Sequence, residues 1–159
     1  CAKGADCTWF HRTPVRSDEA CVDTVKDVFG RERHKDHRED MGGVGSINSP
    51  SRTLYVGGLR MNAYQDADEL ERRIWQQFGE WGEVENVNII PRLSIAFVRY
   101  RTRSSCEFAR EAMFNQSLGA GEVLNLRWAY DDPNPVAQAT AARGDFDATM
   151  AALHAQGAV

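Results

Sequence analysis

The residues near the N-terminus that could hold a metal ion are Cys1, Cys7 and His11, spaced Cys-x5-Cys-x3-His. Thiolates and imidazoles are the ligands that Zn²⁺ takes in structural sites, which are tetrahedral and have four ligands. The spacing is typical of the last three ligands of a Cys-Cys-Cys-His finger, so we expect the first ligand several residues before Cys1. Cys21 lies ten residues after His11 and is a poor substitute. We predict a partial zinc finger over residues 1–13.

Two aromatic residues, Trp9 and Phe10, stand between the last two of these candidate ligands. In fingers of this class that position offers aromatic surface to unpaired bases, so both residues are candidates for RNA contact. The alternative is a coincidental Cys/Cys/His triple in which Trp9 serves only local packing.

A second set of candidate residues lies in two short apolar segments. RNA-binding βαββαβ domains carry the signature basic-Gly-aromatic-small-Phe-Val-x-aromatic on one strand. Here the segment 93–100 reads Leu-Ser-Ile-Ala-Phe-Val-Arg-Tyr, which fits the last five positions and departs from the first three. The partner hexamer on the first strand is Leu-Tyr-Val-Gly-Gly-Leu at 54–59. The departures at Leu93 and Ile95 predict modest affinity or limited sequence choice.

Side chains two residues apart share a face of a strand, so the pattern also predicts orientation. If the small and aliphatic residues face the helices, an outer face is left with two aromatic rings and two guanidinium groups. Its predicted members are Tyr55, Ile95, Phe97, Arg99, Asn125 and Arg127. Such a face suits stacking of RNA bases, although the rings could instead be covered by a C-terminal segment or bind a protein.

These candidate residues need a scaffold, and the pattern between them predicts one. Strands are expected from Leu54, over 84–90, over 94–100 and over 123–129. A helix is expected after the capping pair Asp66 and Glu69, and a second after Ser104 and Glu107. This order predicts an α+β fold, a ferredoxin-like βαββαβ RNA-recognition motif over 52–132. The tail over 133–159 could form a short helix lined by Phe146, Met150 and Leu153.

Residues 14–51 are rich in charge and then in glycine, which predicts an extended connector. Its basic cluster could contact phosphate or could simply be a solvated charged surface; the members are Arg31, Arg33, His34, Lys35, His37 and Arg38. Neither histidine has an evident nucleophile or substrate pocket nearby in sequence, so proton transfer is not expected.

The net charge of −4 counts against a nucleic-acid partner, but the excess of acidic residues lies mainly in the C-terminal tail. Residues 131–159 carry one basic and four acidic side chains, whereas 52–130 carry ten of each. No apolar run could cross a membrane and no signal peptide is recognisable, so a soluble intracellular protein is expected. We find no nucleophile set, phosphate-cradling glycine loop or pair of carboxylates, and therefore predict no catalytic residues and no enzyme.

The most specific segments are 27–31 (Asp-Val-Phe-Gly-Arg), 36–45 (Asp-His-Arg-Glu-Asp-Met-Gly-Gly-Val-Gly) and 53–58. With the finger they resemble a family of spliceosomal pre-mRNA-splicing factors of the nineteen complex, which have a CCCH zinc finger and one RNA-recognition motif. The resemblance covers roughly residues 1–135.

The resemblance implies a nuclear protein that bridges the nineteen complex and the catalytic RNA of the active spliceosome, U6 snRNA and the intron, with zinc as cofactor. Neither a membrane nor a small-molecule substrate is expected. The implied RNA contacts are Trp9 and Phe10, the connector from Arg31 to Gly43 including Met41 and Gly42, and the sheet at Tyr55 and Phe97. The absent first zinc ligand and upstream torus domain are departures from the family pattern. A protein-interaction module with incidental RNA contact is the alternative.

Overall fold

The computed structural model describes residues 1–130, 143, 146–147, 150–151 and 154–155. Its contacts divide the chain into two units, Cys1–Ala129 and Tyr130–Val159. In the second unit Phe146 and Met150 are helical, whereas Leu153, the third residue predicted to line a tail helix, lies outside the described residues. The predicted finger, connector and RNA-recognition motif all belong to the first unit.

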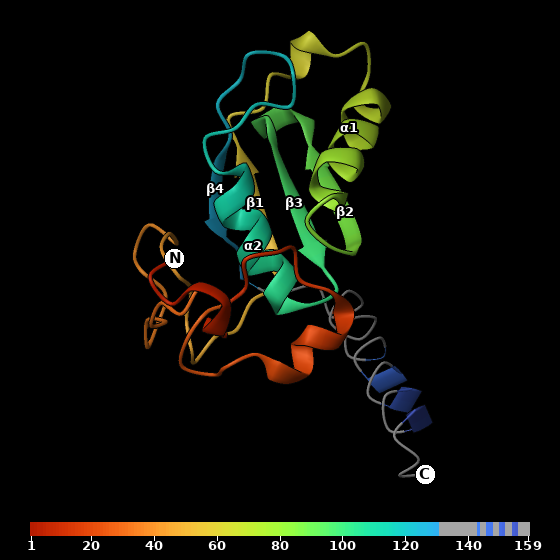
Figure 1. The fold of residues 1–159 in the computed structure, drawn as a ribbon. Coiled ribbons are helices and arrows are strands. Elements are labelled where there is room, and N and C mark those ends of the chain that lie inside the picture. Colours follow the sequence, from red (N-terminus) through yellow and green to blue (C-terminus); the bar gives the residue numbers. More distant parts are fainter. Residues whose placement is uncertain (131–142, 144–145, 148–149, 152–153, 156–159) are drawn as a thin grey trace. The chain divides into compact units, whose positions relative to one another are not determined.

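The first unit is built on a four-stranded antiparallel sheet in the order β2-β3-β1-β4 (Figure 1). The strands are β1 (Thr53–Gly57), β2 (Val84–Ile90), β3 (Ile95–Tyr100) and β4 (Asn125–Trp128). Helix α1 (Ala67–Gly79) connects β1 to β2, and α2 (Arg103–Met113) connects β3 to β4. Short 3-10 helices span Gly4–Asp6, Arg16–Cys21, Met61–Ala63 and Pro91–Leu93. This βαββαβ order confirms the predicted α+β class and the RNA-recognition motif.

The core lies between the two helices and one face of the sheet. Strand β3 alternates between half-buried and buried residues along its whole length, because successive side chains point to opposite faces. Burying these apolar side chains stabilises the fold by about 25 cal/mol per Å² removed from water. The sheet contributes Leu54, Val56, Ala96, Val98, Tyr100, Leu126 and Trp128, and the helices contribute Leu70, Ile74, Phe78, Cys106, Ala109 and Met113.

Helix α1 begins where local sequence predicts it. The Asp66 carboxylate accepts a hydrogen bond from the Glu69 N–H at 2.7 Å, and the Glu69 carboxylate accepts one from the Gln65 N–H at 2.7 Å. These bonds satisfy amides that have no partner within the helix. The apolar stripe of the helix is fully buried, as its spacing of four residues predicts.

The predicted capping pair for α2, Ser104 with Glu107, is wrong. Thr102 caps the helix instead, and its hydroxyl accepts a hydrogen bond from the Ser105 N–H at 3.3 Å. Ser104 lies in the first turn, where its hydroxyl donates to the carboxylate of Glu19 at 2.7 Å. Tertiary contacts override the local signature here, because Glu107 is buried and paired with Arg33 of the connector as well as with Arg103 one turn before it.

The connector packs against the sheet and α2 rather than standing apart as a linker. The Trp128 backbone N–H donates to the Met41 carbonyl at 2.7 Å, and its indole N–H donates to the Gly43 carbonyl at 3.0 Å. Gly45 has φ +88°, and a Cβ there would lie 2.9 Å from the Arg103 guanidinium. The connector is therefore hydrogen-bonded to the last residue of β4 and needs glycine where it passes Arg103. Among the described residues, no helix has the length and apolarity to span a membrane.

Candidate nucleic-acid interface and metal site

The outer face of the sheet carries the two predicted aromatic rings. Tyr55 and Phe97 are opposite each other in the register of β1 and β3. Their ring centroids are 6.0 Å apart and their planes meet at 70°, an edge-to-face contact. Both residues are half-buried, whereas their strand neighbours are fully buried in the core. The alternation along the strands therefore places both rings on the face away from the helices.

One register row crosses the whole sheet through these rings. Asn88 on β2 is opposite Phe97, and Arg127 on β4 is opposite Tyr55. Asn88 and Arg127 are exposed, so the row Asn88, Phe97, Tyr55 and Arg127 presents an amide, two rings and a guanidinium side by side. We call it the sheet row. Sequence reasoning missed Asn88 and its exposed neighbour Asn86, although the Val/Asn alternation of this strand was a signal for both.

The remaining predicted residues of the outer face are partly engaged within the protein. The Nε of Arg99 donates to Glu85 at 2.9 Å, beside an irregularity in the pairing of β2 with β3 between Val84 and Asn86. Asn125 is half-buried opposite Gly57, and Ile95 pairs with Ile90 at the end of the sheet. Arg127 is therefore the more available of the two predicted guanidinium groups.

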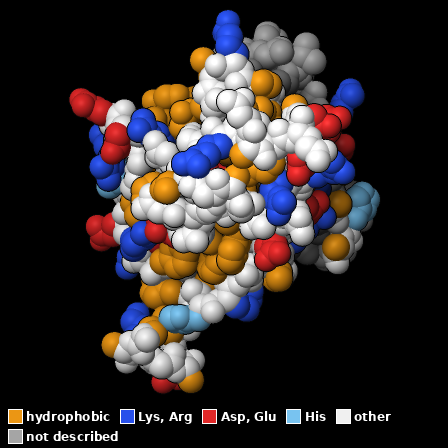
Figure 2. Space-filling model, turned by 90° about the horizontal axis from the view of Figure 1, so that it is seen from above, with side chains coloured by type: hydrophobic (Ala, Val, Ile, Leu, Met, Phe, Trp, Pro, Cys, Tyr) orange, Lys and Arg blue, Asp and Glu red, His pale blue; other side chains and the backbone are white. Residues whose placement is uncertain are grey.

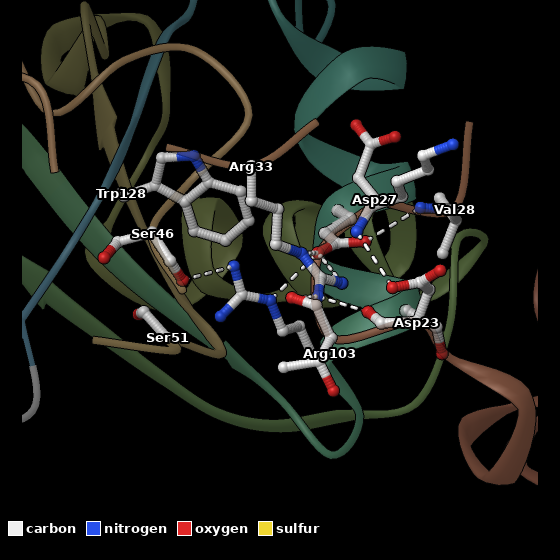
Figure 3. A network of polar contacts seen from close by, with 12 residues as sticks. Asp23, Asp27, Val28, Arg33, Ser46, Ser51, Arg103 and Trp128 are labelled. Atoms are coloured by element: carbon white, nitrogen blue, oxygen red, sulfur yellow. Dashed lines mark hydrogen bonds and ion pairs between the residues drawn. The ribbon is translucent and has the colours of Figure 1, made fainter. Parts of the chain in front are cut away.

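Arg33, predicted to contact RNA, points into the protein. Its side chain is only 4% exposed, and its Nε and Nη2 lie 2.9 and 2.6 Å from the same Glu107 oxygen. Its Nη1 donates to the carbonyls of Asp23 and Thr24 (Figure 3). A guanidinium used in this way inside the fold is not part of the RNA surface proposed below.

Glu107 is the centre of this buried network. Its carboxylate also accepts from Arg103 Nε at 2.9 Å and from the Val28 N–H at 3.1 Å. Arg103 in turn donates to the Ser46 carbonyl at 3.1 Å (Figure 3). Burial raises the pKa of Glu107, and the two arginines oppose that rise. The network, which we call the Glu107 network, holds the connector on α2.

The other predicted connector residues differ in exposure. Arg31 is exposed but paired with Asp27 at 2.8 Å and Glu111 at 3.1 Å. His34 and His37 are half-buried. His34 packs against Gly43, because a Cβ added to Gly43 would lie 2.7 Å from His34 Nε2. Burial lowers the pKa of His37. Lys35 and Arg38 are exposed, Met41 packs against the core, and Gly42 and Gly43 are half-buried.

The exposed part of the connector adjoins the sheet row. Met41 accepts the backbone hydrogen bond of Trp128, which follows Arg127 on β4. The pKa of Asp40 is lowered, chiefly by the hydrogen bond from the Gly42 N–H, with smaller effects from the charges of Arg38 and Arg127. Arg38 is paired with Asp40 at 2.8 Å, and the charge of Arg127 also acts on this carboxylate, so the basic surface continues from the sheet to the connector.

The predicted metal ligands lie together. One ligand atom from each of Cys1, Cys7 and His11 lies within 4.8 Å of the other two. Ligands at about 2.0–2.3 Å from a tetrahedral Zn²⁺ are roughly 3–4 Å apart, so the three side chains fit three corners of such a site. Cys21 is exposed and outside the group, and no other Cys, His, Asp or Glu among the described residues joins it.

Trp9 and Phe10 attach the finger to the connector. The indole of Trp9 lies against Gly30, where a Cβ would approach its Cε2 to 2.6 Å. The Phe10 N–H donates to the Val28 carbonyl at 3.1 Å. Both rings are half-buried, and Lys26 lies 5.7 Å from the Trp9 ring. The residues predicted to contact bases therefore also position the finger.

Comparison with known proteins identifies relatives of the chain. No protein-family model matches it. Over 138 residues, 87% of its length, it is 51% identical to the pre-mRNA-splicing factor cwc2 of Dictyostelium discoideum, of which it covers 26%. It is 45% identical over 139 residues to CWC2 of Yarrowia lipolytica, covering 87% of this chain and 36% of that protein. The chain is a homologue of the Cwc2 splicing factors.

The similarity to Cwc2 is not confined to the sheet domain. A match of 138 residues is longer than the whole segment 52–159, so it includes part of the connector. The chain spans between about a quarter and two fifths of the length of its Cwc2 relatives. Among solved structures, the C. elegans NONO-1 homodimer matches with 24% identity and a TM-score of 0.42, covering 52% of this chain and 30% of that chain. The Cwc2 homology confirms the predicted family.

Proposed function

We propose that this chain is the RNA-binding segment of a non-enzymatic nuclear splicing factor, linking proteins of the nineteen complex to U6 snRNA and intron RNA. The sheet row carries this proposal, because two outward aromatic rings are flanked by an exposed amide and an exposed guanidinium. Stacking on an aromatic side chain is worth about 1–3 kcal/mol per base. Homology to Cwc2 splicing factors supports an RNA of the spliceosome as the ligand.

The connector extends the proposed surface. Lys35 and Arg38 are exposed, and the charges of Arg38 and Arg127 both act on Asp40. Phosphate contacts by Lys and Arg supply affinity and register, whereas the rings bind the bases. RNA lying over Tyr55 could thus pass β4 and meet the connector.

We propose zinc as the metal of the finger, held by Cys1, Cys7 and His11 with a fourth ligand from outside this group. When bound, it acts as a structural ion and takes part in no reaction. The residues around it then keep Trp9 against Gly30 and Phe10 on Val28. Their remaining exposed surface adds to the contact with RNA.

Binding of single-stranded oligonucleotides to a Tyr55→Ala/Phe97→Ala variant tests the sheet row. We expect affinity to fall by at least tenfold, since each ring contributes about 1–3 kcal/mol. Trp75→Ala is the matched control, because Trp75 is an exposed aromatic on α1 and not on the sheet. Unchanged affinity in a double variant with intact thermal unfolding would remove the sheet from the RNA surface.

Ultraviolet crosslinking of assembled spliceosomes tests the choice of RNA. We expect crosslinks from Tyr55, Phe97 and residues 31–43 to U6 snRNA and the intron. Retained association with nineteen-complex proteins without any crosslink from these residues favours the alternative, a protein-interaction module with incidental RNA contact.

A further inference from the structure

A pocket opens at the end of the sheet where β1 finishes and β3 begins. It has a volume of about 520 Å³. The chain segments around it are the loop after β1 and the turn between β2 and β3, at the top of Figure 1. We call it the loop pocket; it is lined by Leu59, Arg60, Met61, Asn62, Ala63, Pro91 and Ser94. Figure 2 looks down on this end of the molecule, where hydrophobic and basic side chains are interspersed near the centre.

The loop pocket continues the track that begins at the sheet row. A Cβ added to Gly57 would lie 2.8 Å from Tyr55 Cε1 and 2.9 Å from its hydroxyl, so the Tyr55 ring lies over Gly57. The ring therefore extends along β1 toward Leu59. On β3, Phe97 and Ile95 share the outer face, and Ser94 comes next. Both strands thus lead from the rings to the pocket.

The pocket also includes Ser94, one of the three positions at which the strand signature fails. Ser94 occupies the signature's glycine position and has φ +55°, the left-handed region that favours glycine. A non-glycine residue is strained there, and such strain persists where the surroundings hold it in place. Ser94 lines the pocket, and its side chain carries a hydroxyl that glycine would lack. Leu93, in the signature's basic position, is 56% exposed, and Ile95 replaces the aromatic.

The chemistry of the lining suits one flat heterocycle. Leu59, Met61 and Pro91 give apolar surface, and the unbranched side chain of Met61 can adapt to a ring. Asn62 and Ser94 offer hydrogen-bonding groups for a base edge. Arg60 is exposed at the same loop, where its guanidinium can meet a phosphate. The volume falls within the range of about 300–1,000 Å³ for small-molecule pockets.

We propose that the loop pocket binds one unpaired nucleobase of the RNA strand that stacks on Tyr55 and Phe97. This inference rests on the proposed function, because it needs RNA on the sheet row. The base that an aromatic residue at position 95 of β3 would stack is bound instead by the loops beside this strand. The base beyond the two stacked ones enters the pocket, and its phosphate meets Arg60.

A scan of abasic positions tests the pocket with the full chain. Binding of four octanucleotides, each made of a single kind of nucleotide, is measured first. The one that binds most tightly is then prepared as a series in which one nucleotide, at each position in turn, lacks its base. We expect the unmodified protein to lose affinity at the stacked positions and at one further position, by about tenfold each. Asn62→Ala and Ser94→Gly should lose sensitivity at that further position alone. Gln76→Ala, on the exposed surface of α1, is the control and should keep the full profile.

Ser94→Gly keeps the test interpretable, because glycine relieves the backbone strain and the variant should unfold at an equal or higher temperature. If both pocket variants keep the unmodified profile while Tyr55→Ala/Phe97→Ala weakens binding, the loop pocket is not a base site and the proposed function stands. If the unmodified protein binds none of the octanucleotides, both proposals are overturned.

Discussion

The outer sheet face and the inner side of the connector are built from similar residues and have opposite roles in the structure. Each has aromatic rings and arginines. Arg127 is exposed beside Tyr55, whereas the Arg33 side chain is 4% exposed and paired with a carboxylate that is 2% exposed. A guanidinium on a surface can meet phosphate, whereas a buried one must keep its partner or destabilise the fold. Residue type alone therefore does not distinguish a ligand-binding arginine from a structural one.

The comparison also narrows the RNA surface. The basic run of the connector contains one buried arginine, one paired with two carboxylates and two half-buried histidines. Lys35 is exposed, and Arg38 is exposed together with its ion-pair partner Asp40, whereas the exposed Arg31 is held by two carboxylates that include the buried Asp27. The surface offered to RNA is thus smaller than the number of basic residues indicates.

The largest expected effect on stability comes from removing the buried carboxylate of Glu107. Glu107→Gln leaves Arg33 and Arg103 buried without their carboxylate, so we expect the free energy of unfolding to fall by about 3–5 kcal/mol. Urea denaturation measures it. The control is Glu111→Gln, one turn further along α2, which removes a partly exposed partner of Arg31 and Arg110 and should cost less, about 1 kcal/mol. Equal losses in the two variants would show that the network does not hold the connector.

Metal removal should affect the finger and spare the sheet. We expect elemental analysis to find zinc bound to the protein, and almost none in Cys7→Ser. A chelator should change the fluorescence of Trp9, whose indole lies against Gly30, because the finger loses its anchor. The thermal unfolding of the sheet should persist. A Cys21→Ser variant is the control, and loss of zinc in that variant would make Cys21 a ligand.

A smaller effect is expected at the exposed arginine of the sheet row. Arg127→Gln should weaken RNA binding several-fold and reduce the slope of log affinity against log salt by about 0.7, the value for one phosphate contact on a single strand. Arg99→Gln should change the slope less, because the Arg99 guanidinium is paired with Glu85. Titrations of RNA at several salt concentrations measure both slopes. A larger change of slope in Arg99→Gln than in Arg127→Gln would make Arg99, not Arg127, the arginine that contacts phosphate.

The smallest effect concerns an exposed ion pair at the junction of finger and connector. Hydrogen bonds from Arg12 and from the Val15 N–H lower the pKa of Asp18 to about 2. A carboxyl with a lowered folded-state pKa stabilises above its unfolded value, and that contribution is lost as pH falls from about 4 to about 2. Carboxyl-detected NMR titration should show this pKa, and Arg12→Ala should raise it toward the ordinary value. An unchanged pKa in Arg12→Ala would leave the backbone bond as its main cause.

Local patterns predicted the scaffold of the RNA-recognition motif well. The alternation at Leu54, Tyr55 and Val56 predicted which side chain faces out, because a strand has a period of two. The capping pair at Asp66 and the apolar stripe of α1 predicted that helix, because both patterns depend on residues that are close together in the sequence. Asn88 was missed although its strand had been recognised, because the residues of β2 were not assigned to faces.

Long-range contacts account for what local patterns could not predict. Ser104 and Glu107 have the spacing of a capping box, yet Glu107 binds Arg33, 74 residues earlier in the chain. The composition of the connector predicts a linker, but its backbone pairs with Trp128, far away in the sequence. The periodicity of a sequence reflects contacts within one helix or strand, so it cannot predict partners that are far apart in the chain.

The amino-acid sequence by itself determined the order of strands and helices, the outward rings and the spacing of the metal ligands, because each depends on residues close along the chain. Only the tertiary structure decided which arginines remain exposed and that the unmatched Ser94 lines a pocket. Burial and pairing are set by segments that meet only when the chain folds, and they determine whether a charged side chain stabilises the fold or binds a ligand.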